Sequence, residues 1–288
     1  MRTYVVTFLA GCLAGCGSNS ASSDSGASSD GAGTDGGTTT TGDGGATSGT
    51  FSFFVTSYKG LQQLSGSSLG FGGDLRYGET GAGAGLRGAD KICATLAEAS
   101  LAGSGTKGWH AFLSAADDGN GAQVNAIDRI GSGPWYDRLG RLFAPDKASL
   151  MSTRPAGGDT TIKNDFPNED GVPNHNPDGT GAVDNHDMLT GTGSDGTLYA
   201  SGHCLNWTAN AGNKTTEGQP RVGHSWPRGG GGGGGPGGGS IDSWMSSLTE
   251  SGCAPGVNLV EMGGPQANSN TVGSGGGYGG FYCFATTP

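Results

Sequence analysis

One segment of this glycine-broken chain has the pattern of a long amphipathic helix. Between Gly85 and Ala99 the apolar residues recur at steps of three and four, which places them on one helical face. These residues are Leu86, Ala89, Ile92, Cys93 and Leu96. The spacing therefore predicts a helix over 85–99 with Cys93 on its buried side. A disulfide from Cys93 would tie this helix to the segment that supplies the second sulfur.

The rest of the folded part is expected to consist of short strands and long loops. With 62 glycines and 33% hydrophobic residues, the 288-residue chain has a thin core, which favours one domain. Aromatic, β-branched or alternating segments predict strands at 51–57, 109–115, 141–144 and 280–285. The last of these is expected to be a buried, central strand. Segments 60–85 and 157–196 are rich in turn residues and predict long loops, and 229–239 is a glycine-rich insertion.

The N-terminus has the layout of an export signal. Arg2 precedes a short apolar run, Tyr4 to Ala14, which is too short to span a membrane. The tetrapeptide Leu13-Ala14-Gly15-Cys16 is similar to a bacterial lipobox, so residues 1–15 are expected to be a lipoprotein signal peptide and Cys16 to be lipidated. Lipidation at Cys12, in an earlier Leu-Ala-Gly-Cys, and an ordinary secretory signal are the alternatives.

Residues 16–50 are expected to form a tether between the lipid and the domain. They are almost wholly Ser, Gly, Thr, Ala and Asp, so they cannot bury enough apolar surface to fold. Several acyl chains on Cys16 would anchor the protein stably. Gly17, in place of aspartate, favours sorting to the outer membrane. We therefore expect a protein anchored to the bacterial envelope through lipid, at the outer membrane or cell surface, with one domain over 51–288.

The charge of the chain limits its partners. The net charge is −10, and an acidic surface is repelled by phosphate backbones and by anionic lipid. The sequence therefore argues against nucleic acid as a partner. It is compatible with solubility or with divalent cations.

The cysteines predict two disulfides. With Cys12 removed and Cys16 lipidated, an even number remains in an exported chain, and three pairings are possible. The remaining cysteines are Cys93, Cys204, Cys253 and Cys283. A nested pairing, Cys93 with Cys283 and Cys204 with Cys253, would tie the predicted helix to the last strand. No pair has Cys-x-x-Cys spacing, which disfavours a zinc site at these cysteines.

Five short motifs in order resemble a known family. They are Gly85-Leu86-x-Gly88-Ala89-Asp90-x-x-Cys93, Ala126-x-Asp128-Arg129-Ile130, Thr190-Gly191-Thr192, Cys204-x-Asn206-Trp207-Thr208 and Tyr282-Cys283-Phe284. Together they look like the C-type-lectin-like fold, and more closely like an endostatin-like domain of spirochaete and myxobacterial surface lipoproteins. The resemblance covers about residues 51 to 286. It implies an α+β fold with small twisted antiparallel sheets, one main helix, long irregular loops and two disulfides.

The usual calcium motif of sugar-binding C-type lectins is absent from this sequence. Those lectins hold calcium with a Glu-Pro-Asn or Gln-Pro-Asp triplet and with a Trp-Asn-Asp triplet, and neither is present. Asn206-Trp207 follows its cysteine and does not match. Members of the superfamily without these triplets bind proteins or matrix components, or have no known ligand.

The loop 165–187 carries the pattern of a different calcium site. Asn174, Asn176 and Asp178 alternate as oxygen donors before a glycine, which suits a calcium ion held at a tight turn. Asp165 and Asp170 are further candidate ligands in the same loop. The alternative is a solvated turn, in which the same residue types are common. Calcium is therefore the cofactor that the sequence suggests.

Other candidate residues are scattered. His110, His175, His186, His203 and His224 show no metal-ligand spacing, so each is expected to be a surface or hydrogen-bonded loop residue. Three aromatic residues beside turns, Trp135, Tyr136 and Trp226, are expected to be exposed ligand contacts. Trp109, Trp207 and Phe281 are expected in the core.

The sequence favours a non-enzymatic, surface-displayed binding module with a lectin-like domain. Its ligand would be an extracellular polysaccharide, matrix component or protein. One alternative is an extracellular hydrolase that uses Asp165, Asp170, His175 and His186, although the chain has no Gly-x-Ser-x-Gly nucleophile turn. The other alternative is a purely structural envelope lipoprotein.

Overall fold

The computed structural model describes residues 50–175, 185–227, 243–260 and 264–287. Several predictions concern parts of the chain outside the described residues. These are the signal peptide, Cys16, all but the last residue of the tether, the insertion 229–239, Asn176 and Asp178.

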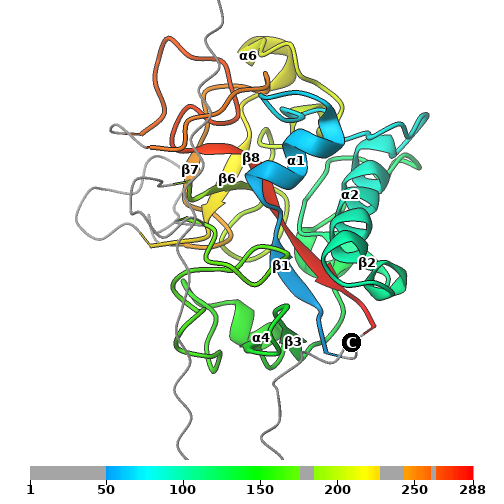
Figure 1. Cartoon of the computed structure of the whole chain (residues 1–288). Coiled ribbons are helices and arrows are strands. Elements are labelled where there is room, and N and C mark those ends of the chain that lie inside the picture. The colour runs from blue at the N-terminus through cyan, green and yellow to red at the C-terminus, as the bar shows by residue number, and fades with distance from the viewer. Residues whose placement is uncertain (1–49, 176–184, 228–242, 261–263, 288) are drawn as a thin grey trace, which may run out of the picture. The chain divides into compact units, whose positions relative to one another are not determined.

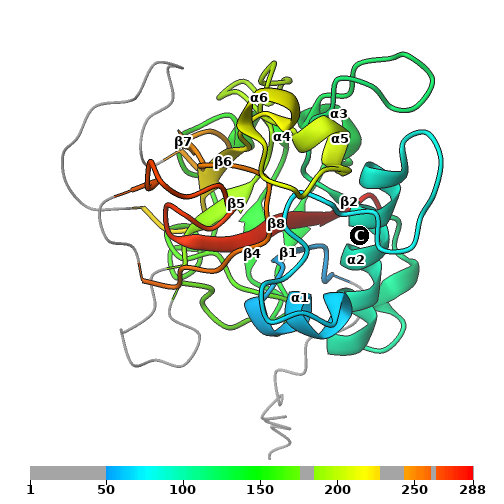
Figure 2. The same ribbon diagram turned by 90° about the horizontal axis from the view of Figure 1, so that it is seen from above.

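The fold is built around β8 (Gly277–Ala285), in which every residue is buried. The second half of β8 pairs antiparallel with β1 (Phe53–Val55) on one side and with β2 (Trp109–Ala111) on the other. The first half pairs in parallel with β5 (Asp187–Leu189). In Figure 1 the red β8 lies beside the blue β1, and Figure 2 shows β8 crossing the middle of the domain. The prediction of a buried central strand at the end of the sequence is confirmed.

Two further strands extend this sheet beyond β5. They are β6 (Arg221–His224) and β7 (Leu248–Thr249), and the strand order is β1-β8-β5-β6-β7, with β2 also paired to β8. A separate two-stranded ribbon is formed by β3 (Trp135–Tyr136) and β4 (Leu142–Ala144). The observed architecture is thus a mixed α+β fold with small sheets.

The predicted main helix is confirmed as α2 (Ala84–Ser100), which lies alongside β2 in Figures 1 and 2. Its glycines let other backbone segments approach closely. A Cβ on Gly88 would lie 2.2 Å from the carbonyl oxygens of Leu75 and Arg76, and one on Gly85 would lie 2.2 Å from that of Asn206. Packing therefore requires glycine at positions 85 and 88, because the side chain of any larger residue would collide with the backbone of a neighbouring segment.

The structure corrects the expectation of a loop over the whole of 60–85. An eight-residue helix, α1 (Tyr58–Ser65), occupies its start. Ser57 caps the helix by accepting a hydrogen bond from the Gly60 N–H, and Gly66 ends it in a left-handed conformation (φ 66°). The sequence contains both of these end signals.

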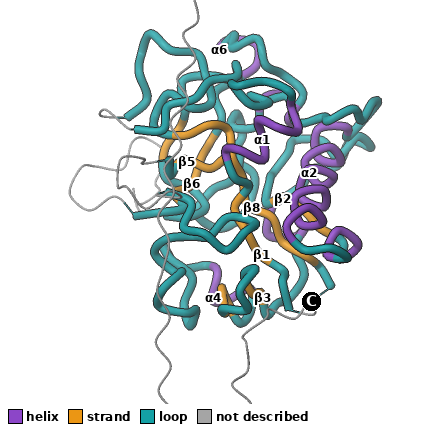
Figure 3. Tube along the Cα trace, in the orientation of Figure 1, coloured by secondary structure: helices purple, strands orange, loops and turns teal. Residues whose placement is uncertain are grey.

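The remaining helices among the described residues are single turns. They are η1 (Ser104–Thr106), α3 (Ala126–Arg129), α4 (Lys147–Leu150), α5 (Cys204–Trp207) and α6 (Lys214–Glu217). Figure 3 shows that loops make up most of the fold. Within the described part of the chain, no helix has the length and apolar character needed to cross a bilayer.

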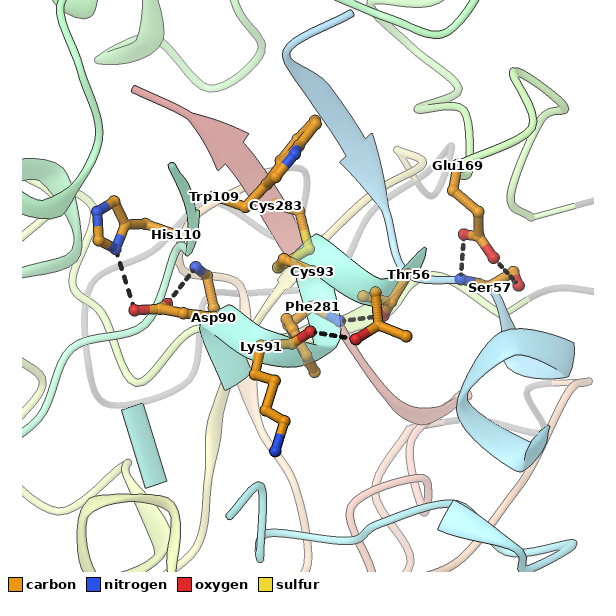
Figure 4. Close-up of a disulfide and its surroundings, with 12 residues drawn as sticks. Thr56, Ser57, Asp90, Lys91, Cys93, Trp109, His110, Glu169, Phe281 and Cys283 are labelled. Carbon is orange, nitrogen blue, oxygen red and sulfur yellow. Dashed lines mark hydrogen bonds and ion pairs between the residues drawn. A yellow bond between two sulfur atoms is a disulfide. The ribbon is translucent and has the colours of Figure 1, made fainter. Parts of the chain in front are cut away.

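Both disulfides of the nested pairing are present. Cys93 of α2 bonds to Cys283 of β8, and Cys204 bonds to Cys253, with Cα–Cα distances of 5.6 and 5.7 Å. The first bridge fastens the main helix to the central strand (Figure 4).

Aromatic rings fill the core. Phe53 stacks on Phe143, and Phe284 contacts both of these rings. Trp109, Trp207 and Phe281 are buried, as predicted. The expectation that Trp135 is exposed is wrong, because the β3–β4 ribbon turns this ring edge-on against Phe284 and leaves it 1% exposed.

Candidate functional site

Three side chains capable of binding a metal meet in the core, at the start of β5 and the end of β6. They are His186, Asp187 and His224, hereafter the His–Asp centre. Their candidate ligand atoms lie within 4.8 Å of one another, and each side chain is at most 1% exposed. Nε2 of His224 lies 3.0 Å and Nε2 of His186 lies 3.5 Å from Oδ1 of Asp187. The expectation of a surface or hydrogen-bonded loop residue is therefore wrong for His224, which is buried in β6, whereas His186 lies in the loop before β5 but is buried.

Strand register brings the three side chains together. Asp187 lies directly opposite His224 in the antiparallel β5–β6 pair, so both side chains lie on the same face of the sheet. The register of β5 against β8 shifts after Asp187, and the N–H groups of His186 and Asp187 both donate to the Gly276 carbonyl. Two adjacent donors to one acceptor are typical of a β-bulge, which lets neighbouring side chains reach a common point.

The ring of His224 is oriented by Ser247. Oγ of Ser247 lies 3.1 Å from Nδ1 of His224. Burial lowers the pKa of His224, against the opposing effect of Asp187, so the ring is neutral at neutral pH. A proton on Nδ1 would be shared with Ser247 and would leave the lone pair of Nε2 facing Asp187.

A second buried carboxyl, Glu250, lies next to Asp187. Glu250 accepts hydrogen bonds from Ser274 Oγ and Gly275 N at 2.6 and 2.8 Å. Burial and the neighbouring Asp187 raise the pKa of Glu250 well above its ordinary value. Burial also raises the pKa of Asp187, but the two histidines and Glu250 outweigh it and hold that pKa at about 2. The pair therefore carries one negative charge, on Asp187.

The contacts from Ser247 to His224 and on to Asp187 follow the order of a serine hydrolase triad. All three side chains are at most 3% exposed, however, and a substrate carbonyl must be able to reach the nucleophile. A cluster buried to this extent is better suited to holding a cation than to turning over a substrate.

The residues of the predicted calcium loop are dispersed where the structure describes them. Asn174 is buried, and its amide exchanges hydrogen bonds with the Tyr278 hydroxyl. Oδ2 of Asp165 lies 2.8 Å from Nδ1 of His175, whereas the backbone N–H of Asp170 donates to Asn168. Because Asn176 and Asp178 lie outside the described residues, the calcium loop stays a prediction.

The residues proposed for the hydrolase alternative do not form one cluster where the structure describes them. Asp165 and His175 form one pair, and His186 belongs to the His–Asp centre. Trp226, expected to be an exposed contact, is half-buried and stacks on His175 with ring centroids 4.5 Å apart. Tyr136 is also half-buried.

An open groove of about 620 Å³ is lined by the end of α1, the loop that follows it, Asn210 and Pro255. Its lining combines two aromatic rings with polar and charged side chains, and we call it the Tyr77 groove. These residues include Phe71, Asp74, Arg76, Tyr77, Glu79 and Asn210. Phe71 and Tyr77 meet edge to face with centroids 5.8 Å apart. Tyr77 holds a positive φ of 45°, a costly conformation for a residue with a side chain.

The second disulfide holds the wall of the Tyr77 groove in place. The N–H of Gly73 donates to the Cys253 carbonyl, and that of Leu75 donates to Trp207. A Cβ on Gly73 would lie 2.6 Å from Sγ of Cys204. The groove is therefore built on a loop that is fixed on both sides to the Cys204–Cys253 bridge.

Two smaller hollows lie either side of Lys59, with volumes of about 210 and 330 Å³. Ser57, Lys59 and Asp170 line both. Glu169, at the edge of the first hollow, accepts hydrogen bonds from the N–H and hydroxyl of Ser57, and burial raises its pKa to about 7. Figure 4 shows this contact beside the first disulfide.

No protein-family model matches the chain, and no curated protein shows significant similarity to it.

Proposed function

We propose that this protein is a non-enzymatic binding module of the C-type-lectin-like type, displayed on the bacterial envelope by a lipid on Cys16. Its ligand is an extracellular glycan bound in the Tyr77 groove. The envelope location rests on the N-terminal sequence, and the lectin-like assignment rests on the five motifs together with the disulfide pairing and the α+β fold.

The composition of the Tyr77 groove is the observation that carries the glycan assignment. Sugars present apolar ring faces and a rim of hydroxyls, so a binding site needs aromatic surface together with fixed donors and acceptors. Tyr77 and Phe71 supply the aromatic surface, and Arg76, Glu79 and Asn210 supply the polar groups. Arg76 and Asp74 form an ion pair of 2.5 Å, which aligns the guanidinium within the groove.

The buried state of the His–Asp centre supports a binding function over the hydrolase alternative. The groove is open, whereas the cluster that resembles catalytic machinery is enclosed in the core. Preorganisation by the Cys204–Cys253 bridge also suits binding, because a fixed loop loses little entropy when the ligand is captured.

The test is a glycan panel screened with the full chain, produced without lipid as the Cys16→Ser variant. Bound glycans would then be measured by calorimetry against Arg76→Ala and Asn210→Ala, two exposed residues of the groove. Lys59→Ala, an exposed residue of the other hollows, is the matched control. We expect the groove variants to lose at least about tenfold in affinity, roughly 1.4 kcal/mol, and the control to bind normally.

Equal losses in all three variants, or none in the groove variants, would show that the glycan binds elsewhere. Hydrolysis of any glycan in the panel by the folded chain would overturn the non-enzymatic assignment.

A further inference from the structure

We propose that the His–Asp centre binds one divalent transition-metal ion, zinc being the metal that its ligand set favours. Nε2 of His186, the carboxylate of Asp187 and Nε2 of His224 are the ligands. This inference is independent of the proposed glycan binding.

The first argument is the position of the Asp187 carboxylate. Its side chain is 0% exposed, and neither oxygen accepts a well-aligned hydrogen bond from the described chain, although the rings of His186 and His224 and the carboxyl of Glu250 lie beside it. The nearest ring nitrogen, Nε2 of His224, is 3.0 Å away and is not aligned for a hydrogen bond. Buried charges are normally paired and hydrogen-bonded or coordinate a metal, and this carboxylate has two imidazole nitrogens at 3.0 and 3.5 Å without an aligned donor.

Glu250 provides an internal comparison. It is buried as deeply as Asp187 and close to it, but its oxygens accept hydrogen bonds from Ser274 and Gly275. The fold therefore satisfies one carboxyl with protein donors and leaves the oxygens of the other directed at two imidazole nitrogens. The contrast points to a cation between Asp187 and the histidines.

The second argument is the state of the His224 ring. A metal-bound histidine offers the lone pair of one nitrogen and usually donates the other N–H to an oxygen. Nδ1 of His224 lies 3.1 Å from the Ser247 hydroxyl, which leaves Nε2 for the ion. Nε2 of His224 and the ligand atoms of His186 and Asp187 all lie within 4.8 Å of one another, a separation that one ion can bridge.

The third argument concerns the metal. Calcium and magnesium prefer sites made of oxygen ligands alone, whereas two imidazoles with one carboxylate suit zinc and its transition-metal neighbours. His186, Asp187 and His224 provide three ligands, and a water molecule would complete a four-coordinate site. The ion would join β5 and β6.

The rival arrangement is a proton shared between Asp187 and Glu250, with no metal. The test uses the full chain as the Cys16→Ser variant, freed of metal by chelation and dialysis. Zn²⁺, Co²⁺ and Ca²⁺ are added separately, and stoichiometry, melting temperature and, for Co²⁺, visible absorption are measured. We expect one Zn²⁺ or Co²⁺ per chain, a higher melting temperature with Zn²⁺ than with Ca²⁺, and ligand-field bands of a four-coordinate Co²⁺ site.

Variants assign the ligands. His224→Gln and Asp187→Asn are expected to lose Zn²⁺ binding by at least about 100-fold. His175→Gln is the matched control, because His175 contacts Asp165 in a second His–Asp pair that remains partly exposed. If the ligand variants do not fold, the Co²⁺ spectrum of the unsubstituted centre decides the question. A folded chain that binds no Zn²⁺ or Co²⁺ stoichiometrically, or that loses the metal only in His175→Gln, overturns the proposal.

Discussion

Nη2 of Arg129 lies 2.8 and 2.7 Å from the two carboxylate oxygens of Asp90, so two sequence motifs far apart in the chain meet as one ion pair. Asp90 also accepts a hydrogen bond from the Ala111 N–H, and Arg129 donates to the Ala111 carbonyl. The pair therefore ties α2 and α3 to β2. Figure 4 shows Asp90 beside His110, whose Nδ1 lies 3.0 Å from it.

Asp90→Asn is expected to destabilise the fold by about 2 kcal/mol, because it leaves the largely buried Arg129 guanidinium without its counter-charge. The free energy of unfolding would be measured in urea. Asp128→Asn, an exposed aspartate in α3, is the control and should cost less than about 0.5 kcal/mol. Equal effects of the two substitutions would contradict the assigned role of the Asp90–Arg129 pair.

Glu169→Gln is expected to stabilise the protein above neutral pH. Burial raises the pKa of Glu169 to about 7 from the ordinary 4.5, so the folded state binds its proton more tightly than the unfolded state does. The contribution of Glu169 to the free energy of unfolding is fully present below pH 4.5 and is lost as the pH rises to about 7. Relative to the Glu169→Gln variant, the wild type should lose up to about 3 kcal/mol between about pH 4 and about pH 8. Parallel stability profiles in urea would show that Glu169 titrates normally.

Gly223→Ala is expected to destabilise the fold by at least about 3 kcal/mol, because its Cβ would lie 1.7 Å from the Trp244 carbonyl oxygen. Backbone would have to move within the sheet at β6. The control is Gly193→Ala, whose nearest neighbour is the exposed Asp195 carboxylate at 3.0 Å, and which should cost less than about 1 kcal/mol. Thermal melts of the two variants measure the difference.

The two disulfides are expected to contribute unequally. The Cys93–Cys283 bridge spans 190 residues and the Cys204–Cys253 bridge spans 49. Loop entropy gives about 5 and about 4 kcal/mol, so replacing the first pair with alanine should be the more costly. Urea unfolding of the two double variants tests the order. The reverse order would mean that local contacts outweigh loop length.

Ser247→Ala is expected to weaken Zn²⁺ binding by about 10- to 100-fold without unfolding the protein, because His224 loses the hydroxyl that orients its ring. This prediction rests on the proposed metal site. Competition with a chromophoric chelator measures the affinity, and near-ultraviolet circular dichroism checks the fold. An unchanged affinity for Zn²⁺ would show that Ser247 does not support the His–Asp centre.

Local patterns in the sequence are sufficient to predict several parts of the fold. The helix at 85–99 and the buried strand at 280–285 follow from periodicity within the segment itself, and both are confirmed. The two disulfides follow from the cysteine count, although the count alone leaves three pairings open. In each case the signal lies close to the element that it specifies.

Other features depend on contacts between distant segments. The His–Asp centre arises from the pairing of Asp187 with His224 and from the irregular pairing of β5 with β8 around Asp187, and neither leaves a spacing motif in the chain. Trp135 follows Gly133-Pro134, a turn signal that suggests exposure, but the ribbon folds its ring inward onto Phe284. Helix α1 differs from the predicted loop because its Ser57 cap outweighs the glycines around it.

The position of β8 after all its partner strands has a consequence for how the sheet forms. β1, β2 and β5 all pair with β8, and the main helix is bridged to it, so the central sheet cannot close before β8 has been synthesised. Pairings this distant in sequence form slowly. The helix α2 and the strands β1, β2 and β5 therefore reach their final arrangement only after β8 has been made.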